Sequence, residues 1–69
     1  MQKVEMVSPN RLEYKGYAGN VIYDLKTNVY FGRIIEPVLQ GEHGYEGKTI
    51  YDLKESFSKA VDRHIDNQQ

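Results

Sequence analysis

Apolar residues change their spacing once along the chain, close to residue 48. From residue 50 onward they recur every three or four positions, as on one face of an α-helix. Thr49 stands where an N-cap residue is favoured, and Asp52 follows three residues later as in an acidic capping box. We therefore predict a helix over residues 50–66 whose apolar stripe consists of Ile50, Leu53, Phe57, Ala60, Val61, His64 and Ile65.

Before the helix, β-branched and aromatic residues predict strands. Residues 12–24 are expected to form one long strand, in which Gly16 and Gly19 mark a bulge or a close approach of backbone. After a turn at residues 25–28, residues 29–35 predict a returning strand and hence an antiparallel hairpin.

Proline and glycine set the next boundaries. Pro37 ends the second strand because it cannot donate to a strand ladder. A loop through residues 40–44 follows, and Tyr45-Glu46 predicts a short third strand before Gly47. The expected fold class is α+β, a small antiparallel sheet followed by one amphipathic helix.

The register of the hairpin decides which residues share a face. If Asp24 lies opposite Val29, one face carries Ala18, Asn20, Ile22, Phe31, Arg33 and Ile35. The other face then carries Tyr17, Gly19, Val21, Tyr23, Tyr30, Gly32 and Ile34. Both faces are substantially apolar, whereas one helix covers only one of them. An uncovered apolar face predicts a homodimer, a higher homo-oligomer or another protein partner.

Length and composition support this expectation. The chain has 69 residues and no cysteine, so a disulfide cannot supplement its small core. Residues 1–10 are expected to form an arm or a short strand, and residues 11–69 a single domain.

Charge and hydropathy exclude several classes of protein. Nine basic residues against ten acidic ones lack the basic excess of a phosphate-dominated nucleic-acid binder. The apolar runs are too short for a membrane span or a signal peptide. We expect a cytoplasmic protein that does not interact with membranes.

Catalytic chemistry has little support in the residue pattern. Asp24, Glu36, Glu46 and Asp52 have the residue type of a metal-dependent nuclease, but their spacing does not place two on one strand face. His43 and His64 have no neighbouring nucleophile or carboxylate in a recognisable arrangement. We therefore expect no enzymatic activity, no catalytic or metal-binding residue and no cofactor.

Tyrosine is the most distinctive residue type. Its side chains could cover half-buried sheet surface, contact another protein, or stack on nucleic-acid bases. The chain has six, at positions 14, 17, 23, 30, 45 and 51.

Four ordered segments resemble the HicB antitoxin family. The shared pattern is Tyr-x-Gly on the first strand, aromatic-Gly on the second, Gly-x-Thr at the helix start and Phe-x-x-Ala-Val-Asp on the helix. In this sequence the segments are Tyr14-Lys-Gly-Tyr-Ala-Gly-Asn-Val-Ile-Tyr-Asp24, Tyr30-Phe-Gly-Arg-Ile34, Tyr45-Glu-Gly-Lys-Thr-Ile-Tyr-Asp-Leu53 and Phe57-Ser-Lys-Ala-Val-Asp62.

The resemblance implies a partial ribonuclease-H-like fold and a function in prokaryotic toxin–antitoxin systems. Such antitoxins neutralise a HicA-like toxin, a small protein that cleaves messenger RNA, and usually oligomerise. Position 64 is histidine where the family often has an aromatic residue. The sequence ends at Gln69, before the family's final strand and DNA-binding module, so direct DNA binding is not expected of this chain.

These observations give two sets of candidate residues. The partner-binding candidates are Tyr17, Tyr23, Tyr30, Ile34, Glu42 and Glu46. The structural candidates are Gly16, Gly19, Gly32, Gly47, Thr49, Leu53, Phe57 and Val61. Two alternatives to an antitoxin stay open, a stand-alone dimeric structural or regulatory protein and a residual metal-dependent nuclease.

Overall fold

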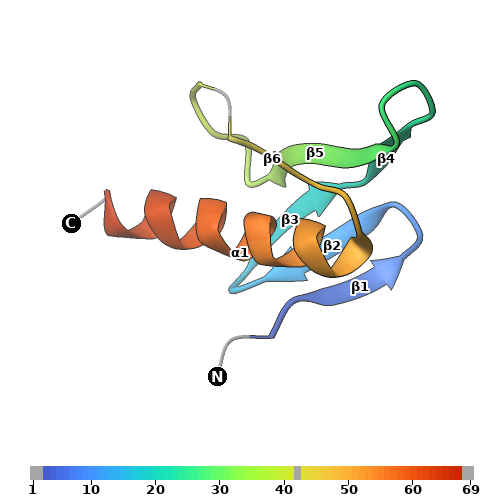
Figure 1. Ribbon diagram of the computed structural model, residues 1–69. Coiled ribbons are helices and arrows are strands. Elements are labelled where there is room, and N and C mark those ends of the chain that lie inside the picture. The colour runs from blue at the N-terminus through green and yellow to red at the C-terminus, as the bar shows by residue number, and fades with distance from the viewer. Residues whose placement is uncertain (1–2, 42, 68–69) are drawn as a thin grey trace.

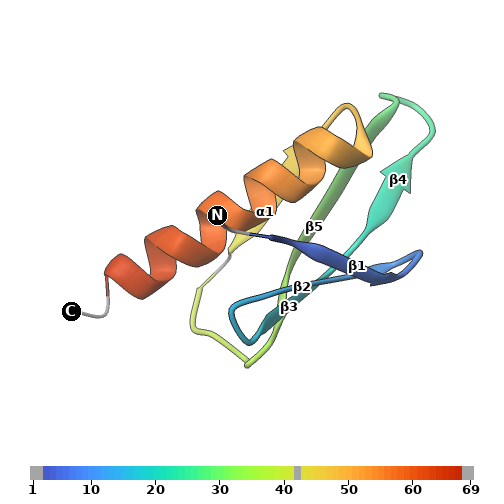
Figure 2. The ribbon, with the colours of Figure 1, turned by 90° about the horizontal axis from the view of Figure 1, so that it is seen from below.

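Six short strands precede one helix in the computed structural model, which describes residues 3–41 and 43–67. The strands form a curled antiparallel sheet, and the helix packs across one of its faces (Figures 1 and 2). The fold is therefore α+β, as predicted. The elements are β1 (Glu5–Ser8), β2 (Arg11–Tyr14), β3 (Tyr17–Asn20), β4 (Ile22–Asp24), β5 (Val29–Glu36), β6 (Gly44–Gly47) and α1 (Ile50–Asp66).

Helix α1 spans the predicted residues. The hydroxyl of Thr49 caps its first turn by accepting a hydrogen bond from the backbone N–H of Asp52, at 3.0 Å. Leu53, Phe57 and Val61 are fully buried, which confirms the direction of the apolar stripe. The helix is thus held by its packing face, since a helix of this length is marginal alone.

The prediction of one long strand over residues 12–24 is wrong. The chain reverses at Lys15-Gly16, where φ is 53° and 82°, so β2 and β3 pair as a separate hairpin with Tyr14 opposite Tyr17. Two successive residues at positive φ are the pattern of a type I′ turn, in which glycine is favoured. Gly16 therefore marks a turn and not a strand bulge.

The predicted hairpin is confirmed at its turn, in the expected register. Asp24 pairs with Val29, and the turn between them is closed by a hydrogen bond from the Asn28 N–H to the Asp24 carbonyl, at 2.8 Å. Strands β3 and β4 both pair with β5, and the chain between them departs from the ladder at Val21. Strand β5 is consequently the central strand of the sheet.

The predicted third strand is β6, which pairs with the other edge of β5. Gly47 ends it where the chain turns into the helix, and a Cβ there would lie 2.5 Å from the backbone nitrogen of Leu53. Only glycine allows so close an approach, which explains this structural candidate.

The N-terminal segment has a strand. Residues 5–8 form β1, which pairs with β2, and Met6 lies opposite Leu12 on the side of the helix. The core lies between this side of the sheet and α1, and consists of Leu12, Tyr14, Ile34, Tyr45, Leu53, Phe57 and Val61.

Candidate partner-binding surface

The strand tyrosines lie on the side of the sheet that the helix covers. Tyr14 and Tyr45 approach the ring of Phe57, with ring centroids 6.4 and 5.0 Å apart. Tyr23 and Tyr30 share this side, because Tyr30 alternates in phase with the buried Ile34 and pairs with Tyr23. Tyr23 and Tyr30, two of the partner-binding candidates, therefore do not lie on the face that the helix leaves uncovered.

Tyr45 fills a gap in the backbone of the sheet. Its hydroxyl donates to the carbonyl oxygens of Asn20 and Arg33, at 2.8 and 3.2 Å. A Cβ at Gly19 would lie 2.0 Å from this hydroxyl, so the glycine makes room for the ring. Burial raises the pKa of Tyr45 well above its ordinary value. These features assign Tyr45 and Gly19 to the scaffold.

A second buried tyrosine connects the β2–β3 turn to the helix. The Tyr14 hydroxyl donates to both carboxylate oxygens of Asp62, at 3.0 and 3.1 Å. Lys15 forms an ion pair with the same carboxylate, at 3.0 Å. Burial, followed by the bond to Asp62, raises the pKa of Tyr14. Asp62 is therefore engaged within the fold.

Tyr17 contacts His64 near the end of the helix, and His64 in turn contacts His43. The ring centroid of His64 lies 5.6 Å from that of Tyr17 and 5.1 Å from that of His43. His43 Nε2 lies 3.0 Å from the carbonyl oxygen of Gln40. Tyr17 is half-buried in this contact, so it supports the loop before β6 more than it offers a surface.

Three other partner-binding candidates have different surroundings. Ile34 is only 8% exposed and packs in the core, which removes it from any surface. Glu46 is exposed and pairs with Phe31 across the strands, on the uncovered face of the sheet. Glu42 lies outside the described residues.

The end of the β4–β5 hairpin exposes apolar side chains on both sides. Leu25 at the turn is 81% exposed, and Ile22, Tyr23 and Phe31 are between 39% and 44% exposed. Tyr23 stacks at a tilt on Tyr30 with centroids 4.7 Å apart. We call these five residues the hairpin end. Exposed apolar groups gathered on one element are typical of a contact surface.

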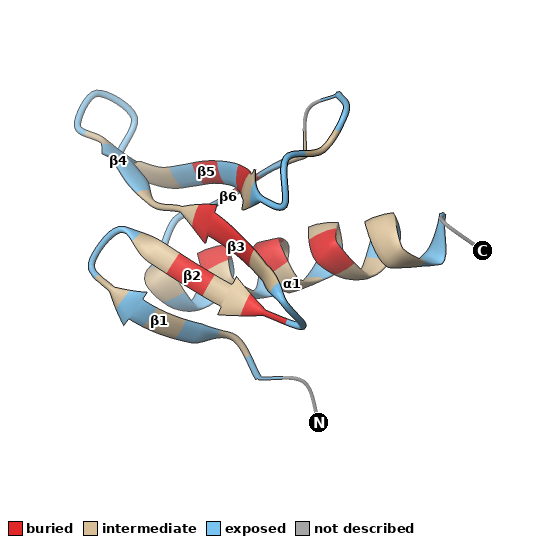
Figure 3. Cartoon of the chain, turned by 180° about the vertical axis from the view of Figure 1, so that it is seen from behind, coloured by how far each residue is buried: buried red, intermediate tan, exposed pale blue. Residues whose placement is uncertain are grey.

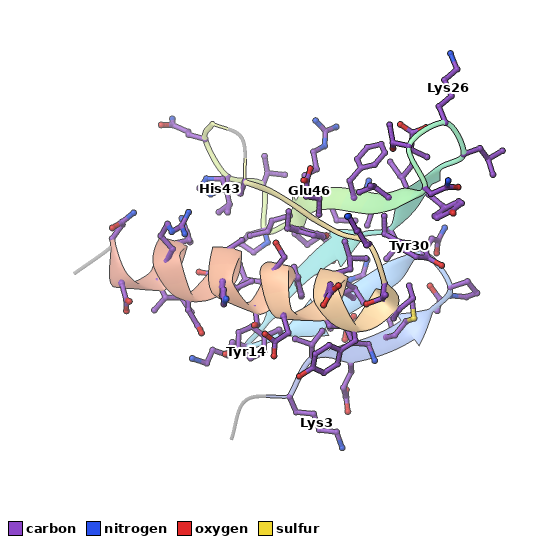
Figure 4. The ribbon with its side chains drawn as sticks, viewed as in Figure 1. Lys3, Tyr14, Lys26, Tyr30, His43 and Glu46 are labelled. Carbon is purple, nitrogen blue, oxygen red and sulfur yellow. The ribbon has the colours of Figure 1, made fainter. Side chains whose placement is uncertain are left out.

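The two sides of the hairpin end differ in their surroundings. Figure 4 places Tyr30 beside the start of the helix, and Tyr23 packs on Tyr30. Asp52 is close, since a Cβ at Gly47, the cross-strand partner of Tyr30, would lie 2.8 Å from the Asp52 Cβ. This side therefore combines two tyrosines with an acidic residue.

The other side is the uncovered face of the sheet, which Figure 3 shows without a helix over it. A shallow hollow of about 320 Å³ lies there. Arg11, on the same face, is paired with Glu13 and Glu36 at 3.0 and 2.6 Å. The hollow is lined by Asn20, Ile22, Phe31, Gly32, Arg33 and Gly44.

The carboxylates considered for a nuclease do not converge. Asp24 accepts a hydrogen bond from the Lys26 N–H in its turn, at 2.9 Å. Glu36 is paired with Arg11, and Asp52 lies in the first helical turn. Within residues 3–41 and 43–67, no group of three histidine, aspartate or glutamate side chains could hold a metal ion.

Comparison with protein-family models, curated proteins and solved structures finds no match to this chain. In the part of the chain that the structure describes, no helix has the length and apolar character needed to cross a lipid bilayer.

Sequence reasoning missed Ile22, Leu25, Phe31 and Arg33 as surface residues. Ile22, Phe31 and Arg33 are exposed because they lie on the face of the sheet away from the helix. Leu25 is exposed because it lies in the turn between β4 and β5, beyond the start of the helix at Ile50. The predicted register already placed Ile22, Phe31 and Arg33 on one face of the hairpin. It did not determine that this face points away from the helix.

Proposed function

We propose that the chain is a protein-binding module of the HicB antitoxin type, which neutralises a HicA-like, messenger-RNA-cleaving toxin. The observation that carries the proposal is the hairpin end, where large apolar side chains remain exposed on a folded scaffold. The family resemblance supplies the identity of the partner, and the α+β fold with one helix is compatible with it.

The tyrosine side of the hairpin end suits such a partner best. A toxin that cleaves RNA carries basic surface for phosphate. Asp52 lies against Gly47, the strand partner of Tyr30, and offers a carboxylate on this side of the hairpin end. Glu46 is on the opposite side of the sheet, so one flat surface does not engage it together with the tyrosines. Central aromatic residues dominate affinity in such contacts, and rim charges tune association rate.

The direct test is co-expression. The protein should restore growth to cells that make the small basic protein encoded in the neighbouring reading frame. If growth stays arrested while both proteins are soluble, the antitoxin proposal is wrong.

A binding measurement then tests the surface. Tyr23→Ala should weaken binding of the purified toxin by about tenfold or more, because it removes an exposed ring from the centre of the contact. Tyr51→Ala is the matched control, since Tyr51 is 70% exposed but lines a hollow with Lys3 and Val4. Equal losses in the two variants, measured by calorimetry, would exclude the tyrosine side as the contact.

No specific observation favours a nuclease. The alternative of a dimer gains a structural argument from the uncovered face.

A further inference from the structure

Four residues on the uncovered face of β5 and β6 occupy the corners of a rectangle. Phe31 lies opposite Glu46, and Arg33 lies opposite Gly44. One diagonal therefore joins the two opposite charges, Arg33 and Glu46, and the other joins Phe31 and Gly44. Cross-strand neighbours are about 5 Å apart, and successive residues on one face are about 6.8 Å apart along a strand.

The charges on this rectangle are not used within the chain. Among residues 3–41 and 43–67, neither Arg33 nor Glu46 takes part in an ion pair. Arg11, by contrast, is already paired twice. The rectangle therefore presents, at opposite corners, one cation and one anion that have no ion pair among the described residues.

Apolar surface lies next to these charges. Phe31 is 39% exposed and Ile22, its cross-strand partner on the other side, is 44% exposed. Gly44 has no side chain, so the hollow over it stays open.

We propose that this face binds a second copy of the chain, in a two-fold symmetric dimer. The two-fold axis would lie between the two stacked sheets, parallel to the Phe31–Gly44 diagonal. Rotation about this axis brings each end of the other diagonal over the opposite end of that diagonal in the second copy. Arg33 of each copy then faces Glu46 of the other, and the Phe31 side chains pack together near the axis. Two sheets that stack face to face lie about 10 Å apart, a span that an arginine and a glutamate bridge together.

The arrangement of charges selects a second copy over an unrelated protein. In a two-fold interface the same patch serves both partners, so each charge must find its opposite within the patch itself. Arg33 and Glu46 meet this condition, because the symmetric dimer would contain two Arg33–Glu46 pairs, one from each copy to the other. The strands of the two sheets would cross at roughly 70°, close to the orthogonal class of sheet packing.

Charge reversal with mixing tests the pairing. Sedimentation of the wild-type chain from about 1 to 100 µM should show a species of twice 8.0 kDa. Arg33→Glu alone and Glu46→Arg alone should each raise the dimer dissociation constant by about tenfold or more, because like charges then face each other. An equimolar mixture of the two variants restores both pairs and should recover the dimer. Lys26→Glu, at the exposed turn, is the matched control and should leave the dimer intact.

A second variant tests the same surface without charge. A Cβ at Gly44 would meet only the Gly32 carbonyl oxygen, at an ordinary 3.5 Å, so Gly44→Leu should fold normally and fill the hollow. It should sediment as a monomer with an unchanged circular dichroism spectrum.

Three results would overturn the proposal: a wild-type monomer throughout this range, dimers that persist in all three variants, or a mixture of charge-reversed chains that stays monomeric. None of these measurements involves a toxin, so they decide the dimer separately from the antitoxin function.

Discussion

Two glycines, one on each of two strands that pair with β5, have opposite tolerance for a side chain. A methyl group at Gly19 would collide with the Tyr45 hydroxyl, whereas one at Gly44 would reach only ordinary contact distance. Gly19→Ala should therefore destabilise the fold by about 1–3 kcal/mol through overpacking. Gly44→Ala should change stability by no more than about 0.5 kcal/mol. Urea unfolding of the two variants checks this, and equal midpoints would mean that Tyr45 does not occupy the gap.

Tyr45 should also make stability depend on alkaline pH. Its pKa is raised in the folded state by burial, so the folded protein holds this proton more tightly than the unfolded chain. The stability it contributes is complete below pH about 10, the ordinary tyrosine pKa, and is lost as pH rises toward the folded value.

Tyr45→Phe should therefore flatten the alkaline decline in stability while lowering stability at neutral pH, since two hydrogen bonds are lost. Thermal melts from pH 7 to 11 provide the measurement. A decline as steep in the variant as in the wild type would assign the effect to other groups, such as Tyr14.

At the scale of elements, helix α1 depends on one buried ring. Phe57 is fully buried and contacts both Tyr14 and Tyr45. Phe57→Ala should cost about 3–5 kcal/mol, close to the whole stability of a small domain. Tyr51→Ala removes a ring of similar size from the exposed face of the same helix and should cost little. A melting temperature for Phe57→Ala within a few degrees of wild type would mean that the ring is not central.

The helix was predictable because its signals are local. Thr49 and the three-to-four-residue spacing determine its start and its buried side without reference to the sheet. The β2–β3 turn was missed because Lys15-Gly16 lacks the Asn-Gly or Asp-Gly pair that usually marks such turns. The candidate surface was only partly predictable: pairing gave the two faces, but which face the helix covers depends on the packing of Phe57 against Tyr14 and Tyr45.

At the scale of the whole molecule, self-association should stabilise the fold. If dimers form through the uncovered face, binding adds to the free energy of unfolding by mass action. The melting temperature of the wild type should then rise with protein concentration, whereas that of Gly44→Leu should not. Calorimetric scans over a hundredfold range of concentration test this, and a concentration-independent wild-type melt would count against the dimer.

The hydrogen bond from Tyr14 to Asp62 joins residues that are 48 positions apart in the chain, whereas the strand pairs connect near neighbours. Contacts between residues that are close in sequence form early because they close short loops, whereas a contact between residues far apart in sequence forms late. Asp62→Ala should therefore leave the folding rate almost unchanged and accelerate unfolding, the behaviour of a contact absent from the transition state. Stopped-flow folding and unfolding rates in urea would show it, and a slower folding limb would contradict it. The lifetime of the folded state then depends on the hydrogen bond that connects helix α1 to strand β2.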